Sequence, residues 1–155
     1  YTLSDLANYV NENQDLIWGL DTEFSERADG LPGMAEHYGM NVDDKNLKIM
    51  EVGMTFEALD RGQVDITMVF STDGKIKKYD LQILEDDKQF FPVYNPCVCV
   101  REEVLEQYPE IEEIVAPIGE LTNEVMQELN YQVDATGLPA VLVAKNYLNE
   151  QGYLD

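Results

Sequence analysis

The chain has 155 residues, 45% of them hydrophobic, and its 31 acidic and 10 basic side chains give a formal net charge of −21 at pH 7. That length suits one compact domain or part of a larger two-lobed protein. Nucleic acids and anionic membrane surfaces attract clustered Lys and Arg, so this charge argues strongly against both as partners. It indicates a solvated acidic surface, with a weak bias toward cationic ligands.

The first two thirds of the chain alternate between helix and strand patterns. Helical periodicity and turn signals predict helices at 3–13, 30–40 and 52–62. Ser4 is the expected N-cap of the first helix. Short apolar runs predict strands at 15–21, 46–50, 63–70, 81–84 and 96–100. Such alternation is typical of an α/β layer around a largely parallel sheet.

The pattern changes after Arg101, where the sequence is almost wholly helical and is interrupted by proline and glycine. No apolar run approaches the ~20 residues that a transmembrane helix needs. The chain also starts without a basic and apolar leader. We therefore expect either that a leader has been removed or that the chain is an internal piece of a longer protein.

Metal binding and nucleophilic catalysis have few candidate residues. One histidine, His37, and the pair Cys97 and Cys99 cannot supply the four ligands of a structural zinc site. The two cysteines are expected to be small buried residues. His37 is expected to be a surface or packing residue, since no nucleophile motif accompanies it. No metal and no cofactor is therefore predicted.

Aromatic and polar residues occur together where strands are expected to end. Phe70 ends the strand at 63–70, Ser71, Thr72 and Asp73 follow it, and Tyr94 stands at a second expected crossing. Ligands of open α/β sheets sit beyond the carboxyl ends of strands. Aromatic faces attract quaternary ammonium groups through the ring quadrupole. These aromatics are therefore either part of a cage for a small cation or ordinary core residues.

Three blocks of the sequence resemble one family of transport proteins. They are EFSERADGLPGMAEHYGM at 23–40, EALDRGQVDITMVFSTDGKIKKYDLQILEDDKQFFPVY at 57–94 and MQELNYQVD at 126–134. In this order they closely resemble the substrate-binding proteins of compatible-solute ABC importers, the glycine betaine/choline/carnitine-binding family. The similarity extends from about Leu3 to Leu148.

The resemblance implies an α/β, periplasmic-binding-protein-like (type II) clamshell. Residues 1–93 would form its inserted lobe, and residues 94–155 would form the crossover strand and C-terminal helices of the other, incomplete lobe. The family's N-terminal segment, about as long again as the lobe present, has no counterpart here. The helices after Arg101 would then need a partner for their apolar faces. We expect a second copy of the chain, as a homodimer or a segment swap, or the rest of a longer protein.

The resemblance also implies site residues. Two tyrosines of the family's aromatic box stand where this chain has Phe70 and Tyr94, so the first position keeps an aromatic face but loses a hydroxyl. Arg27 matches the arginine that meets the ligand carboxylate in betaine-binding members, with Glu23 nearby. A guanidinium fork suits a carboxylate well. Residues 71–73 would shape the floor of the box.

Together these features predict the extracytoplasmic solute-binding component of an ABC transporter, without catalytic activity, which captures glycine betaine, choline or carnitine. Its expected partner is an ABC permease, fused to it in some relatives. Its expected location is the extracellular face of the cell membrane or the periplasm. The alternative is a small acid–base hydrolase that uses Asp73 and a neighbouring carboxylate. Convergence of Phe70, Tyr94 and Arg27 on one pocket would favour the binding protein.

Overall fold

A parallel three-stranded sheet lies at the centre of the N-terminal part of the chain. The computed structural model describes residues 1–94, 97–117 and 121–154. The strands are β1 (Trp18–Leu20), β2 (Leu47–Ile49) and β3 (Ile66–Thr67), in the order β2–β1–β3. Trp18 pairs with both Leu47 and Ile66 in parallel register. This pairing confirms the predicted α/β layer and its parallel strands.

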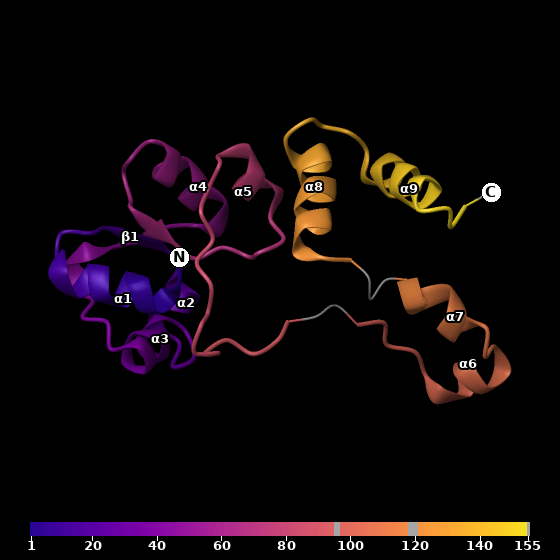
Figure 1. Cartoon of the computed structure of the whole chain (residues 1–155), viewed down its shortest axis with the longest axis horizontal. Helices are drawn as coiled ribbons and strands as arrows, with labels where there is room; N and C mark the ends of the chain where they lie inside the picture. Colours follow the sequence, from indigo (N-terminus) through magenta and orange to yellow (C-terminus); the bar gives the residue numbers. More distant parts are fainter. Residues whose placement is uncertain (95–96, 118–120, 155) are drawn as a thin grey trace.

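Short helices surround this sheet, as Figure 1 shows. They are α1 (Leu3–Glu12), α2 (Thr22–Glu26), α3 (Leu31–Tyr38), the 3-10 helix η1 (Asp44–Asn46), α4 (Val52–Asp60) and α5 (Gly74–Lys78). The apolar core is built from helix and strand side chains that include Leu3, Val10, Trp18, Leu20, Phe24, Leu31 and Met34. The short helices α2 and α5 were not expected from periodicity, because five residues are too few to show it.

The first helix begins earlier than its predicted cap. Thr2 is the N-cap of α1: its hydroxyl accepts a hydrogen bond from the Asp5 N–H, and the Asp5 carboxylate accepts one from the Thr2 N–H. This reciprocal capping box satisfies two amide groups that the helix leaves unpaired. Ser4 is therefore wrong as the predicted cap. It lies inside the first turn, where its N–H donates to the Asp87 carboxylate.

Two of the five predicted strands are wrong within the described residues. Residues 81–84 form no strand; the chain instead makes an isolated bridge between Thr2 and Glu85. Residues 97–100 are also irregular, and Cys97 and Cys99 are exposed free cysteines, contrary to the expected burial. Residues 95–96 lie outside the described residues. An apolar run becomes a strand only when a neighbouring strand accepts its hydrogen bonds, and that depends on tertiary structure.

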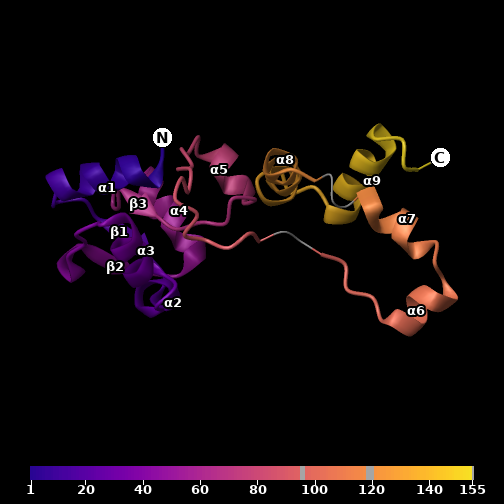
Figure 2. The ribbon, with the colours of Figure 1, turned by 60° about the horizontal axis from the view of Figure 1, so that its bottom comes forward.

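The predicted helical character after Arg101 is confirmed. The helices are α6 (Glu102–Gln107), α7 (Ile111–Val115), α8 (Asn123–Asp134) and α9 (Ala140–Glu150). In both views α8 lies beside α5, whereas α6 and α7 extend away from the sheet (Figures 1 and 2). Their apolar side chains remain accessible, and Ile114 is 71% exposed. No helix among the described residues is both long and apolar enough to cross a membrane.

The burial pattern of α4 yields a stability test. Phe56 is 1% exposed, whereas Met54 on the same helix is 61% exposed. We expect Phe56→Ala to lower the free energy of unfolding by about 3–5 kcal/mol, because it removes a buried ring and leaves a cavity. Met54→Ala should change it by about 0.5 kcal/mol or less. Urea denaturation of both variants measures the difference, and equal losses would contradict this packing of α4.

Candidate functional site

The carboxyl ends of the three parallel strands lie at one edge of the sheet. Glu23 and Arg27 follow β1, and residues 70–73 follow β3, whereas Tyr94 comes later, after α5. A recess of about 560 Å³ opens at the ends of β1 and β2, within the range of roughly 300–1,000 Å³ typical of small-molecule sites. Its lining is Asp21, Thr22, Glu23, Ile49, Met50, Glu51 and Met54. The recess thus combines exposed apolar side chains with carboxylates, and it includes Glu23 from the predicted site.

Arg27 is held between two carboxylates at the end of α2. Its Nη1 lies 2.7 Å from Glu23 Oε1, and its Nε lies 2.5 Å from Asp29 Oδ1. The negative charge of Asp29, followed by the hydrogen bond that Arg27 donates to Glu23, raises the pKa of Arg27 above its ordinary value. Arg27 therefore stays cationic, and a ligand carboxylate would have to replace or join one of these two partners. The expected proximity of Glu23 and Arg27 is observed.

The loop after β3 presents Phe70 to solvent, with 68% of the residue exposed. Within the loop, the Phe70 carbonyl accepts a hydrogen bond from the Asp73 N–H at 3.0 Å. Asp73 is the N-cap of α5, and its Oδ1 accepts from the Lys75 N–H at 2.9 Å. The Asp73 carboxylate is thus engaged in starting a helix, which is a structural task.

The carbonyl groups of this loop are bound by α8. Gln127 Nε2 donates to the Ser71 carbonyl at 2.6 Å, and Asn130 Nδ2 donates to the Thr72 carbonyl at 2.7 Å. Sequence reasoning did not identify these two amides, although both lie in the block MQELNYQVD. A side-chain donor to a backbone carbonyl leaves no mark on the sequence of the loop that accepts it.

A second polar network fixes the segment that leads to Tyr94. The Asp86 carboxylate accepts hydrogen bonds from the Tyr38 hydroxyl, from the Phe90 N–H at 3.0 Å and from the Phe91 N–H at 2.8 Å. The Tyr38 oxygen in turn accepts from the Lys88 N–H at 2.9 Å. We call Asp86–Phe91, held in this way, the strap.

The two ionisable groups of the strap network have shifted pKa values. Partial burial acts to raise the pKa of Asp86, but hydrogen bonds from Tyr38, Phe91 and Phe90 outweigh it, so the pKa is lowered. Burial, followed by the hydrogen bond to Asp86, raises the pKa of Tyr38 to about 12. At neutral pH the network therefore pairs an ionised carboxylate with a neutral phenol.

Aromatic packing anchors the strap to the core, and Tyr94 extends beyond it. The Phe91 ring stacks on Phe24 with centroids 6.3 Å apart, and Phe90 lies 5.5 Å from the His37 ring. Tyr94, three residues after Phe91, is 74% exposed. Among the described residues, no hydrogen bond, ion pair or ring contact joins Phe70 or Tyr94 to Arg27. Convergence of the three on one pocket therefore stays a prediction.

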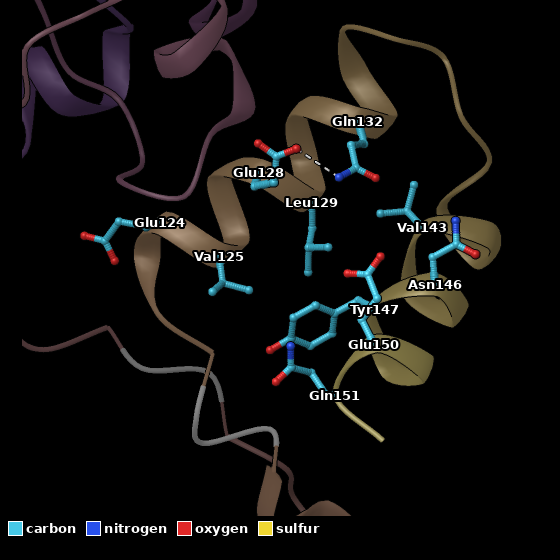
Figure 3. A pocket seen from close by; sticks show the side chains of 10 residues that line it. All are labelled: Glu124, Val125, Glu128, Leu129, Gln132, Val143, Asn146, Tyr147, Glu150 and Gln151. Atoms are coloured by element: carbon cyan, nitrogen blue, oxygen red, sulfur yellow. Dashed lines mark hydrogen bonds between the residues drawn. The ribbon is translucent and has the colours of Figure 1, made fainter. Parts of the chain in front are cut away.

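A further recess lies between α8 and α9, and Figure 3 shows its lining. Its volume is about 360 Å³, and Val125, Leu129, Val143 and Tyr147 give it apolar walls. None of the predicted site residues is among those that line it. The described residues also contain no cluster of three His, Cys, Asp or Glu side chains that could hold a metal ion.

The chain is similar to several transport proteins. Residues 1–150 match the family described as the substrate binding domain of ABC-type glycine betaine transport systems. A glycine-betaine-binding protein of Pseudomonas aeruginosa is 37% identical over 161 residues, which cover 99% of this chain and 52% of that protein. The carnitine transport binding protein OpuCC of Listeria monocytogenes is 33% identical over 156 residues, covering 99% of this chain and 49% of that protein.

Two more matches bear on the fold and on domain organisation. A crystal structure of a glycine betaine/carnitine/choline ABC transporter superimposes with a TM-score of 0.87 at 35% identity, covering 99% of this chain and 54% of that chain. The ergothioneine transport permease/ergothioneine binding protein EgtU of Helicobacter pylori is 33% identical over 152 residues, covering 97% of this chain and 27% of that protein.

These matches define the class of the chain. It belongs to the family of ABC-type glycine betaine substrate-binding domains, which confirms the predicted resemblance and the periplasmic-binding-protein-like fold. Members of this family are substrate-binding transport proteins and not enzymes, as the sequence predicted. The chain spans about half the length of the first two curated relatives described above.

The strap network yields a pH-dependent prediction. Because the pKa of Asp86 is lowered in the folded protein, its contribution to stability is present above the unfolded pKa of about 4 and is lost as the pH falls through the folded value. We expect Asp86→Asn to be less stable than the parent by about 1–3 kcal/mol at pH 7. This deficit should shrink as the pH falls below 4.

Urea denaturation at pH 7, 5, 4 and 3 measures this change. Asp134→Asn at the exposed end of α8 removes the same charge and serves as the control. A deficit that stays constant with pH would show that the Asp86 carboxylate is not preferentially ionised in the folded state.

Proposed function

We propose that the protein containing this chain captures a quaternary ammonium solute such as glycine betaine, choline or carnitine for an ABC importer. The observation that carries this proposal is the family match over residues 1–150, which includes the exposed Phe70 in the loop after β3. A solvent-facing aromatic at the ligand-binding edge of an α/β sheet is suited to a cation that needs no hydrogen bond.

Different predicted residues would contact different chemical groups of the solute. Phe70 and Tyr94 would supply aromatic faces to the trimethylammonium group. Arg27, held by Glu23 and Asp29, would meet a carboxylate when the solute has one. Residues 71–73 would form the floor beneath Phe70, with Asp73 fixing the start of α5.

The remaining part of the site would come from sequence outside this chain. The chain spans about half of its relatives, which agrees with one lobe at 1–93 and a returning part of the other at 94–155. Closure of two lobes around the solute would then be a shift of population driven by preferential binding to the closed form.

The proposed partner is an ABC permease at the outer side of the membrane. The printed name of EgtU joins a permease and a binding protein, so fusion to the permease is one arrangement for this protein, and a separate periplasmic or membrane-attached protein is the other. The homodimer or segment swap stays a prediction, whose motivating observation is the exposed apolar surface of α7. Sedimentation of the chain at several concentrations would test it.

Two observations argue against the hydrolase alternative. Its candidate acid, Asp73, caps α5 through a hydrogen bond to the Lys75 N–H. The family and the relatives are substrate-binding transport proteins. Both observations favour binding without catalysis at this edge of the sheet.

The aromatic contribution of Phe70 can be measured by isothermal titration of glycine betaine into the full-length protein. We expect Phe70→Leu to weaken affinity about tenfold or more, because it keeps an apolar side chain but removes the ring that attracts the cation. Phe70→Tyr should retain binding. Tyr9→Leu, which changes an exposed aromatic on α1, is the control. Unchanged affinity in Phe70→Leu would contradict the role of the ring.

Arg27 is tested by comparing solutes. We expect Arg27→Gln to weaken binding of glycine betaine and carnitine, which carry a carboxylate, and to leave choline binding nearly unchanged. Arg61→Gln is the matched control, because Arg61 makes a similar ion pair with Glu57 four residues earlier on a helix. An equal loss for all three solutes would show that Arg27 acts on the fold and not on the carboxylate.

A further inference from the structure

Two side-chain amides of α8 donate hydrogen bonds to the loop after β3. Gln127 and Asn130 are three residues apart, which places both amides on the same side of the helix. Each donates to a different carbonyl of the same loop, at 2.6 Å for Ser71 and 2.7 Å for Thr72. The loop is therefore held at two successive peptide groups.

The main chains of α5 and α8 approach so closely that a side chain would not fit between them. A Cβ atom on Gly74 would lie 2.3 Å from the Tyr131 nitrogen and 2.6 Å from the Asn130 carbonyl carbon. Such distances are far below van der Waals contact, so glycine is required at the start of α5. The two amides of α8 reach the loop by direct hydrogen bonds.

A charged side chain of α5 makes further contacts with α8. Lys77 forms an ion pair with Glu128, and its Nζ lies 5.4 Å from the centroid of the Tyr131 ring. Gln132 Nε2 donates to the second oxygen of Glu128 at 2.9 Å. The register of α8 along α5 is thus set by an ion pair and a cation–π contact in addition to the loop hydrogen bonds.

We propose that Gln127 and Asn130 are positioning residues of the solute site, which hold the loop so that Phe70 faces the bound cation. The inferred effect of these two residues on solute affinity rests on the proposed function. Phe70 is itself 68% exposed and makes no ring contact among the described residues. Its direction therefore depends on the backbone of residues 70–73, and α8 binds that backbone.

The test uses the full-length protein and substitutions that keep size but remove the donors. Asn130→Asp and Gln127→Glu each place carboxylate oxygens against a backbone carbonyl, and each leaves the loop sequence intact. Asn8→Asp on the exposed side of α1 makes the same chemical change away from the junction. Glycine betaine affinity is measured by titration calorimetry, and amide hydrogen exchange is measured at Asp73 and Lys75, whose N–H groups donate within the loop.

We expect Asn130→Asp to weaken glycine betaine binding about tenfold and Gln127→Glu to weaken it several-fold, with faster exchange at the two loop amides in both. Asn8→Asp should change neither quantity. In the Phe70→Leu background the effect of Asn130→Asp on affinity should largely disappear, because the two residues act through one contact. A variant that only destabilised the fold would instead weaken binding to the same extent in both backgrounds.

Either of two results would overturn the proposal. The first is that amide hydrogen exchange at Asp73 and Lys75 is unchanged in both α8 variants. The second is that the affinity lost in an α8 variant is the same with and without Phe70→Leu. If Asn130→Asp does not fold, Gln127→Glu decides by the same criteria. If the parent protein binds none of glycine betaine, choline and carnitine, the proposed function fails. The exchange rates at Asp73 and Lys75 then still decide whether α8 holds the loop.

Discussion

The close contact between α8 and the start of α5 is the constraint on which the arrangement of this chain depends. The carbonyls of Ser71 and Thr72 lie past the end of β3 and receive their hydrogen bonds from side-chain amides of α8. Backbone groups that leave a sheet need such partners, because an unpaired polar group out of water is costly. The same contact attaches the C-terminal helices to the sheet and sets the direction of the Phe70 loop.

Two separate networks place the two aromatic residues of the predicted cage. Phe70 depends on the α8 contact, whereas Tyr94 follows the strap that Asp86 and Tyr38 fix to the core. In both cases side chains bind main-chain groups: the amides of α8 donate to carbonyls of the loop, and the Asp86 carboxylate accepts from two N–H groups of the strap. Both aromatics themselves are exposed to solvent, Phe70 by 68% and Tyr94 by 74%.

In this acidic chain, carboxylates pair with basic side chains near the candidate site. Arg27 has two carboxylate partners, and Lys77 is paired with Glu128. A surface with a net charge of −21 favours the approach of cationic solutes over anionic ones. Under the proposed function, the ammonium group of a zwitterion such as glycine betaine would meet the aromatic faces, and its carboxylate would compete with Glu23 and Asp29 for Arg27.

The sequence by itself determined the α/β alternation, three of the five expected strands, the helical C-terminal third and the family. These properties follow from local periodicity, turn residues and contiguous blocks, which are written along the chain. It could not determine that 81–84 and 97–100 form no strands, that Thr2 caps α1 through Asp5, or that Cys97 and Cys99 are exposed. Strand formation depends on a distant neighbour that accepts hydrogen bonds.

The candidate site was likewise predictable only in part. The sequence suggested Phe70, Tyr94 and the pair of Glu23 and Arg27, because these residue types stand in recognisable blocks. Only the tertiary structure showed that Asp73 caps a helix and that Asn130 binds the Thr72 carbonyl from 58 residues away. Hydrogen bonds to the backbone carry no signature in the accepting sequence, so folding alone decides which carbonyl an amide reaches.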